Sequence, residues 1–405
     1  MKSFLRRVLN YLKYKYAYFK RKYAANILFS YYANRARFFK KYNSKKVILL
    51  RLDLIGDCTM FTSAAKEICD YYHDREITVV CLSISKPVFE RLGCFDKIIT
   101  LDFRPSEIQY KELLLLIHKL RKDKYDTLLQ PQCSKTPVVD LIAAAVRCNQ
   151  RITIETKPGN SAQEWIDKVN PLYDQIIPYP RGNVSEFDYY AAFVRGVCDP
   201  NYKTVCPSLP YRQQNIIEGD YYVLYPGGSI RQKFWPQEYY ARIAEHIYHE
   251  TGLTGVLLGV ADEQWVADKI AEHIHFPAST SLLDLTGKTT ISDVIDIIGN
   301  ARLVVTNDTS GVHIACATKT PSVVIVGGWH YDRFLPYHIE NVKADDCLPL
   351  VANTPMPCYH CDYNVERENP KCLERLKAGE LSICIEKVTY KQVEELVDRI
   401  LKSTR

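Results

Sequence analysis

The sequence predicts an α/β protein built from two Rossmann-like domains, and three observations support this prediction. The chain has 405 residues, which is too long for one hydrophobic core and suits two domains of ordinary size. Short apolar runs rich in β-branched residues alternate with longer stretches of helical periodicity in both halves. Three of these runs end in polar or glycine-containing turns, which is where open α/β sheets bind ligands.

The first half of the chain has the pattern of one parallel sheet with covering helices. We expect strands at 47–52, 77–82, 97–101 and 126–130, alternating with helices at 58–72, 106–122 and 136–147. Three prolines and a glycine between residues 199 and 220 indicate a linker. The N-terminal domain is therefore placed at 46–205.

The second half repeats the pattern. We expect strands at 222–225, 254–259, 302–306 and 322–326, and helices at 236–250, 262–274 and 291–299. This C-terminal domain is placed at 206–387. A last helical pattern, within residues 388–405, forms a separate C-terminal helix.

Residues 1–45 precede the first predicted strand and form a basic extension. Residues 1–46 hold 14 of the 53 Lys and Arg residues and none of the 47 Asp and Glu residues. An apolar stripe at helical spacing comprises Leu5, Leu9, Leu12, Tyr16, Phe19 and Tyr23, flanked by Arg6, Lys13 and Lys20. A basic amphipathic helix with aromatic residues suits an anionic membrane surface. We favour this over nucleic acid, a solvated arm, or a helix packed on the enzyme or on another subunit.

Other features limit the classes of protein to which the chain can belong. No apolar run approaches the roughly 18 residues needed to cross a bilayer, and the N-terminus lacks a signal-peptide pattern. Fourteen mostly scattered cysteines fit cytosolic thiols rather than a disulfide framework. We therefore expect a cytoplasmic protein.

The most informative segment is residues 303–328, which read LVVTNDTSGVHIACATKTPSVVIVGG. An apolar strand is followed by polar residues at 307–311, which can cap a helix and present backbone N–H groups to an anion. A helix and a second strand complete a βαβ unit. Asp308 and His313 are five residues apart, so both can face one ligand.

A second turn, at 226–229, reads Pro-Gly-Gly-Ser and follows the strand at 222–225. Arg231 and Lys233 come next, and two cations beside backbone amides suit a diphosphate. Taken alone, this segment would be an ordinary turn. Two anion-binding turns in one half of the chain favour a phosphate-containing ligand.

A third turn follows the first strand and carries Asp57. This carboxylate is either a helix N-cap or a general base at the mouth of the sheet. The dinucleotide fingerprint G-x-G-x-x-G is absent from the chain, which argues against a nicotinamide oxidoreductase.

Together these segments resemble glycosyltransferase family 9, the bacterial heptosyltransferases. The resemblance runs from Lys46 to the C-terminus and is carried by LLRLDLIGDCTMFTSAAKEI (49–68), YPGGSIRQKFWPQEYYARIAEHI (225–247), LLGVADEQWVADKIAEHI (257–274) and LTGKTTISDVIDIIGNARLVVTNDTSGVHIACA (285–317). It implies a GT-B fold, in which two Rossmann-like domains face each other across a cleft and the C-terminal helix packs back on the N-terminal domain. It also implies a metal-independent inverting transferase that uses ADP-heptose and a lipopolysaccharide acceptor.

The resemblance implies a role for each motif residue. Asp57 would be the general base, Lys233 would stabilise the leaving diphosphate, and Asp308 would orient the sugar or the cations. Donor-binding roles are implied for Gly228, Ser229, Arg231, Glu263, Thr309, Ser310, Gly311 and His313. Many family members have glycine directly after the Asp-Thr pair, where this chain has Ser310.

Four cysteines near the C-terminus form a separate motif, Cys358, Cys361, Cys372 and Cys384. Four thiolates suit a structural zinc or iron ion, and some protein-modifying members of the resembled family hold iron at cysteines. The alternative is four reduced thiols. We expect no catalytic metal, because four protein ligands leave no open position.

The sequence leaves several alternatives open. The acceptor is a glycan or glycolipid, or a protein in a protein O-heptosyltransferase, and the chain could also bind nucleotide sugars without catalysis. A lipid-linked acceptor would place the enzyme at the inner face of the bacterial cytoplasmic membrane. The chain could form homo-oligomers, and nucleic acid is not an expected partner.

Overall fold

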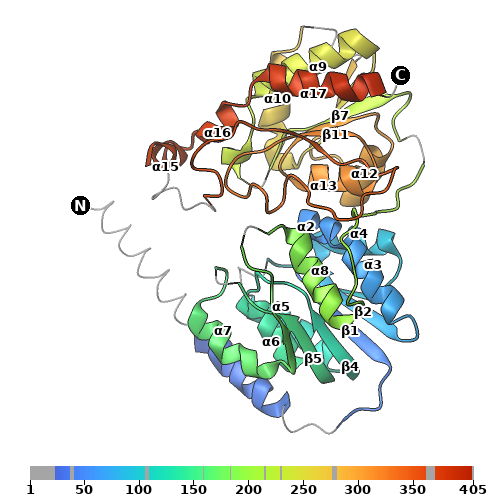
Figure 1. The fold of residues 1–405 in the computed structure, drawn as a ribbon, viewed down its shortest axis with the longest axis vertical. Helices are drawn as coiled ribbons and strands as arrows, with labels where there is room; N and C mark the ends of the chain where they lie inside the picture. Colours follow the sequence, from blue (N-terminus) through green and yellow to red (C-terminus); the bar gives the residue numbers. More distant parts are fainter. Residues whose placement is uncertain are drawn as a thin grey trace.

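A computed structural model shows two domains, one above the other in the view of Figure 1. It describes residues 23–36, 41–104, 109–157, 159–182, 184–213, 216–228, 230–275, 281–361 and 370–403. Each domain contains a six-stranded parallel sheet, ordered β3-β2-β1-β4-β5-β6 and β12-β11-β10-β7-β8-β9. The α/β class and the two Rossmann-like domains are thereby confirmed.

The N-terminal sheet is formed by strands whose residues are mostly buried. Its strands are β1 (Lys46–Arg51), β2 (Glu76–Leu82), β3 (Lys97–Leu101), β4 (Tyr125–Gln130), β5 (Cys148–Ile154) and β6 (Gln175–Ile177). The helices of this domain are α2 (Ile55–Met60), α3 (Thr62–Tyr71), α4 (Lys86–Leu92), α5 (Tyr110–Leu120), α6 (Pro137–Ala145), α7 (Gln163–Val169) and α8 (Glu186–Val197). Because β1 is central and buried on both faces, the turn that follows it lies at the middle of the sheet's carboxyl edge.

The C-terminal sheet has the same organisation. Its strands are β7 (Tyr221–Tyr225), β8 (Thr254–Leu257), β9 (Leu282–Asp284), β10 (Val304–Asn307), β11 (Ser322–Ile325) and β12 (Leu350–Ala352). Its longer helices are α9 (Gln237–Thr251), α10 (Gln264–Glu272), α12 (Ile291–Gly299), α13 (Ser310–Ala317), α15 (Pro370–Lys377) and α17 (Tyr390–Ser403). Strands β7 and β10 are neighbours, so the turns after them lie side by side.

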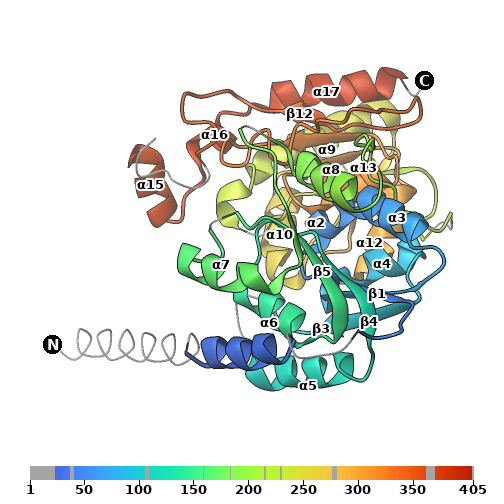
Figure 2. The ribbon, with the colours of Figure 1, turned by 60° about the horizontal axis from the view of Figure 1, so that its bottom comes forward.

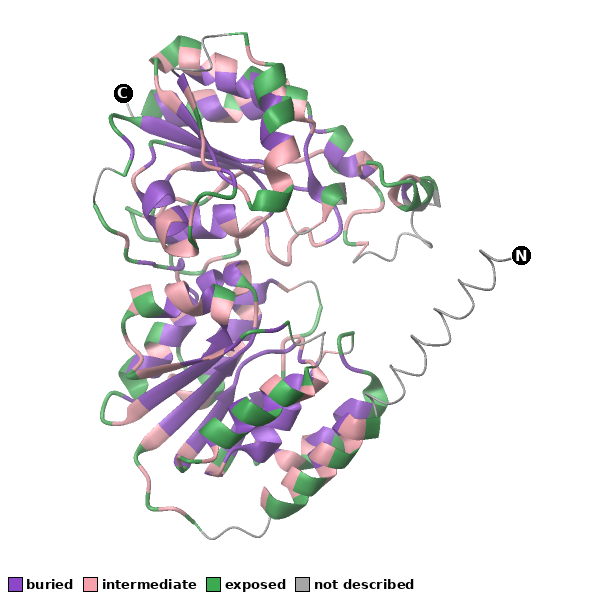
Figure 3. Cartoon of the chain, turned by 180° about the vertical axis from the view of Figure 1, so that it is seen from behind, coloured by how far each residue is buried: buried purple, intermediate pink, exposed green. Residues whose placement is uncertain are grey.

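Burial follows the layers (Figure 3). The strands of both sheets are buried, while the outer helices alternate between buried and exposed residues. One apolar cluster contains residues from both domains, including Phe61 between α2 and α3, Phe187 of α8, Ile295 of α12 and Ile314 of α13. The domains therefore share apolar contacts at their junction.

The predicted helix at 58–72 is two helices. Helix α2 ends at Met60 and α3 begins at Thr62, with Phe61 between them. Helix α2 also begins three residues earlier than predicted, so Asp57 lies in its first turn rather than in the loop before it.

The prediction for the C-terminal helix is wrong. Helix α17 packs on α9, β11 and β12 of the C-terminal domain, and Figure 1 shows it at the end far from the N-terminal sheet. Its apolar residues Val393, Val397, Ile400 and Leu401 complete the core cluster of that domain. Asp398 also pairs with His246 of α9 at 2.7 Å. Burial of the apolar stripe, rather than a crossing between domains, determines its place.

Part of the predicted extension is a helix at 23–36 that lies along the N-terminal domain (Figure 2). Ala25 and Phe29 are buried in its core, and the Phe29 ring lies 5.4 Å from that of Trp165. The predicted amphipathic stripe lies outside the described residues except for Tyr23. No helix within the described ranges has the length and apolar character to span a bilayer.

Candidate active site

Helices α2 and α13 meet at the junction of the two domains, and both begin at the carboxyl edge of a sheet. A Cβ atom on Gly56 would lie 2.9 Å from Cδ2 of His313 and 3.6 Å from the Cα of Ser310. Gly56 therefore allows α2 to approach the first turn of α13. The next residue, Asp57, lies at this junction and is half-buried.

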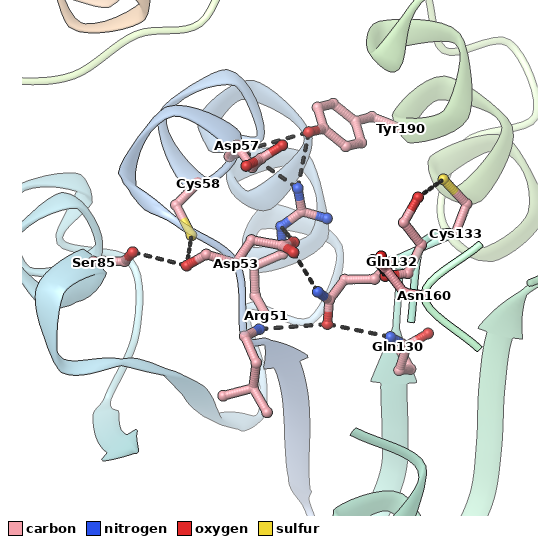
Figure 4. Close-up of polar contacts among 12 residues, drawn as sticks. Arg51, Asp53, Asp57, Cys58, Ser85, Gln130, Gln132, Cys133, Asn160 and Tyr190 are labelled. Carbon is pink, nitrogen blue, oxygen red and sulfur yellow. Dashed lines mark hydrogen bonds and ion pairs between the residues drawn. The ribbon is translucent and has the colours of Figure 1, made fainter. Parts of the chain in front are cut away.

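A buried arginine organises the turn that holds Asp57 (Figure 4). Arg51, at the end of β1, donates to the backbone carbonyl of Asp57 at 3.3 Å and to the Tyr190 hydroxyl at 2.8 Å. Its Nε lies 3.0 Å from the Asp53 carboxylate, which also accepts a hydrogen bond from Gln132. These contacts fix the backbone of the turn and leave the Asp57 side chain at the junction.

The pKa of Asp57 is raised to about 7. Burial is the main cause, and the neighbouring carboxylates of Asp53 and Glu186 raise it further, while Arg51 and Arg333 oppose the shift. A carboxylate with a pKa near neutral accepts a proton more readily than an ordinary aspartate, which is the property of a general base.

The glycine turn after β7 is held by a carboxylate and an amide. Glu263 accepts from the backbone N–H of Gly228 at 2.8 Å and from that of Val260 at 3.0 Å. A Cβ on Gly227 would lie 2.2 Å from the Glu263 carboxylate, so a side chain at this position would displace that carboxylate. Asn307 donates to the carbonyls of Pro226 and Gly227, which joins this turn to the one after β10.

Lys233 and Asp308 form a buried ion pair between these two turns. Nζ of Lys233 lies 3.0 Å from Oδ2 of Asp308, and both side chains are about one-tenth exposed. Burial raises the pKa of Asp308, but Lys233 and His313 lower it by more, and the net shift is downward. Both side chains of the pair therefore remain charged although they are largely buried.

His313 is buried and neutral at physiological pH. Burial lowers its pKa to about 4, and Lys233 adds to the shift while Asp308 opposes it. Its Nδ1 shares a hydrogen bond of 2.6 Å with the Tyr337 hydroxyl, and the two rings are parallel.

The first turn of α13 follows the polar turn after β10. The Thr309 hydroxyl caps the helix by accepting from the Gly311 N–H at 3.4 Å. Ser310 begins the helix, so the positive end of the helix dipole points to the junction. Arg231 is exposed, and its guanidinium lies 4.7 Å from the centre of the Trp265 ring.

Comparison with known proteins gives the family. The model of glycosyltransferase family 9 (heptosyltransferase) matches residues 188–359. The lipopolysaccharide core heptosyltransferase OpsX of Haemophilus influenzae is 21% identical over 306 residues, which cover 74% of this chain and 84% of that protein. Over these matched residues the chain is similar to glycosyltransferase family 9.

Two further proteins are similar to this chain. Lipooligosaccharide heptosyltransferase 2 of H. influenzae is 33% identical over 95 residues, a match that spans 24% of this chain and 27% of that protein. The structure of E. coli ADP-heptose lps heptosyltransferase II has a TM-score of 0.66 and 17% identity, and covers 89% of this chain and 99% of that one. The predicted GT-B fold is confirmed.

The structure brings most of the predicted site residues of the glycosyltransferase together. Around the junction lie the α2 turn, the α13 turn and the Lys233–Asp308 pair, and Glu263 supports the glycine turn beside them. Arg231 lies apart from that pair, against Trp265. Ser229 lies outside the described residues.

The four cysteines of the glycosyltransferase do not form a metal site as placed. The described part of the chain contains no group of three or more His, Cys, Asp or Glu side chains suited to a metal ion. Sγ of Cys384 instead accepts from the backbone N–H of Gly328 at 3.3 Å. Burial raises the pKa of this thiol, and Cys372 and Cys358 are near enough to raise it further. All fourteen cysteines are unbridged.

Sequence reasoning missed three residues that support the site: Arg51, Asn307 and Arg333. A charged residue inside an apolar strand was a usable signal for Arg51, because buried charges need partners. Asn307 lay within the predicted turn, yet its bonds to a turn 80 residues away depend on tertiary structure. Arg333 lies in a loop and has no local signal.

Proposed function

We propose that this glycosyltransferase is an inverting heptosyltransferase that transfers heptose from ADP-heptose to a hydroxyl group of a lipopolysaccharide-type acceptor. The observation that carries the proposal is the junction itself. On one domain, a half-buried carboxylate with a pKa near 7 follows Gly56, which meets the first turn of α13 of the other domain. Asp308, which pairs with the buried Lys233, lies directly before the N-cap of that helix.

Asp57 is the general base of the proposed reaction. Its carboxylate takes the proton from the acceptor hydroxyl as that oxygen bonds to the anomeric carbon, and the bond from that carbon to the diphosphate oxygen breaks on the opposite face. The electron pair leaves with ADP. One base suffices, since direct displacement inverts the configuration without a covalent intermediate.

Lys233 and α13 stabilise the charge that grows on the leaving diphosphate. Asp308 holds the ammonium group at 3.0 Å, which orients it before the donor binds. The N-terminus of α13, at Thr309, Ser310 and Gly311, adds a fixed positive dipole. Glu263 and Gly228 shape the donor turn, and His313 and Arg231 contribute to binding of the sugar nucleotide. No step uses the four cysteines.

The donor and the acceptor are proposed from the names of relatives. E. coli heptosyltransferase II is described as an ADP-heptose lps enzyme, and OpsX as a lipopolysaccharide core heptosyltransferase. Both names fit a site built for a nucleoside diphosphate and a hydroxyl acceptor.

The N-terminal residues hold the enzyme at an anionic membrane surface in this proposal, on the cytoplasmic side where a lipid-linked acceptor is made. On the helix at 23–36, Tyr23, Ile27 and Tyr31 are spaced four apart and at least half exposed. They form an outward apolar stripe on the face opposite Phe29. The basic residues of 1–46 would pair with lipid phosphates.

A donor screen tests the proposed function. The purified chain is mixed with ADP-, GDP-, UDP- and dTDP-sugars, and binding and hydrolysis are measured. Preferential binding of ADP-heptose is expected. Binding of another nucleotide sugar would overturn the donor, binding without transfer to any acceptor would indicate a non-catalytic protein, and transfer to a polypeptide would indicate a protein O-heptosyltransferase.

A further inference from the structure

The segment after β11 carries an arginine across the domain junction. Nε of Arg333 donates to Oε2 of Glu186 at 3.2 Å, and its Nη2 donates to the Ser134 hydroxyl at 3.3 Å. The backbone N–H of Glu186 donates to the Arg333 carbonyl at 2.7 Å. Glu186 begins α8 of the N-terminal domain, so main chain and side chain of Arg333 both join the domains.

The same segment also reaches the donor side of the junction. Tyr337 packs edge-on against Phe187 of α8 with ring centres 4.8 Å apart, and shares a hydrogen bond with His313 of α13. Residues 333–337 therefore connect α8 to α13. The Arg333–Glu186 pair is sheltered, with side chains 21% and 7% exposed.

Several charged and titratable groups surround Asp57, and they come from different elements. They are Arg51 of β1, Asp53 of the following turn, Glu186 and Tyr190 of α8, and Arg333. Cys58 follows Asp57 in α2, and His313 of α13 meets the preceding residue, Gly56. Burial, Asp53 and Glu186 raise the pKa of Asp57, and Arg51 and Arg333 lower it. Arg51 belongs to the same domain as Asp57, whereas Arg333 is the cation contributed by the other domain.

We propose that Arg333 is a positioning residue that joins the domains at Glu186 and sets the charge on the Asp57 carboxylate. This inference rests on the proposed role of Asp57 as the base. Arg333 offsets Glu186 when the domains are together, which favours the ionised base. When they separate, Glu186 is left without this partner and Asp57 holds its proton at neutral pH. The base is therefore active when the two domains are together.

The test is the pH dependence of kcat/KM for transfer from ADP-heptose to heptose-deficient lipopolysaccharide. Arg333→Met removes a positive charge, so the acid limb of the profile should move to higher pH. Glu186→Gln removes a negative charge, so the limb should move to lower pH. Each movement should be about one pH unit, the low end of what a neighbouring charge produces. A residue that acts through structure alone would lower activity without moving the limb in opposite directions.

Two variants serve as controls. Arg195 and Glu340 join α8 to the same C-terminal segment at 2.8 Å, but both side chains are over two-fifths exposed and neither is among the groups that act on Asp57. Arg195→Met should leave the acid limb unchanged. Arg333→Lys keeps the charge and should keep the limb near its wild-type position, which preserves the comparison if Arg333→Met does not fold.

The Asp57→Asn variant distinguishes failure of the proposed mechanism from failure of the proposed role of Arg333. If this variant retains transfer, Asp57 is not the base and the proposed mechanism falls. If it is inactive while both Arg333→Met and Glu186→Gln keep the wild-type acid limb, the role of Arg333 alone is overturned.

Discussion

At the scale of single residues, the site is organised by buried charges that are only partly neutralised. Asp57 has two carboxylates and two arginines around it, and its pKa is raised to about 7. Lys233 and Asp308 pair directly at 3.0 Å in a sheltered position. Such arrangements cost stability and persist where they serve chemistry.

Asp57→Asn should make the protein more stable at high pH. A carboxylate whose pKa is raised on folding favours the folded state while protonated, so its contribution is lost as pH rises from its ordinary range through about 7. A neutral amide removes this loss. We expect the variant to gain on the order of 1–2 kcal/mol in unfolding free energy at pH 8 relative to wild type, and much less at pH 5. Thermal unfolding at both pH values checks this, and equal effects at both would contradict it.

Lys233→Ala should weaken donor binding and slow turnover together, because the ammonium contacts charge that is present in the donor and grows in the transition state. The loss in kcat/KM should be roughly 100-fold or more, as for other groups that stabilise a developing anion. Kinetics with ADP-heptose measure it, and exposed Lys288 provides a control substitution. Unchanged donor affinity and turnover would remove Lys233 from the site.

At the scale of elements, the contact between α2 and α13 determines the geometry of the junction. Gly56 provides the close approach, and Tyr337 holds the His313 ring on the other side. The base and the donor turn are therefore positioned by two short helices that each begin at the end of a central strand.

Gly56→Ala should reduce turnover with little loss of overall stability. The added Cβ would lie 2.9 Å from the His313 ring, which the hydrogen bond to Tyr337 prevents from moving away easily. The two helices must then shift apart, and a displacement near 1 Å at a reacting centre can cost about 100-fold. We expect at least a tenfold loss in kcat with a near-normal unfolding midpoint. Normal kcat would show that the contact does not position the base.

Sequence patterns predicted the long apolar strands and the amphipathic helices, but other elements were missed. Strands β6, β9 and β12 have three residues each, too few to show periodicity, and β5 begins with the polar residues Asn149, Gln150 and Arg151. The motif residues of the site were predictable because they lie in segments that directly follow a predicted strand. The cross-domain contacts of Arg333 and Gly56 depend on the packing of both domains and have no local pattern.

At the scale of the whole molecule, the terminal segments were the least predictable parts. The C-terminal helix was expected on the N-terminal domain and packs instead on its own domain, through Val393 and Val397. For the N-terminal extension, membrane contact was favoured over packing on the enzyme, but Phe29 is buried in the first core. Both segments follow burial of apolar surface, which sequence separation does not reveal.

Two truncations should distinguish the parts of the N-terminal extension. Removal of residues 1–22 should leave a stably folded enzyme with weaker, salt-dependent binding to anionic vesicles. Removal of residues 1–45 should also lower stability by several kcal/mol, because Ala25 and Phe29 leave the core. Vesicle sedimentation and thermal unfolding measure the two effects. Equal vesicle binding by the shorter truncation would contradict the membrane role, and a changed oligomeric state would indicate an assembly role.

The central claim is that Asp57 acts as the base in transfer of heptose from ADP-heptose. The most direct measurement is transfer by the purified chain and its Asp57→Asn variant, with heptose-deficient lipopolysaccharide as acceptor and mass spectrometry of the product. We predict that wild type adds one heptose with an activity that rises with pH through about 7, and that the variant binds the donor within a few-fold but does not transfer it. Transfer by the variant at a rate near that of wild type would contradict this account.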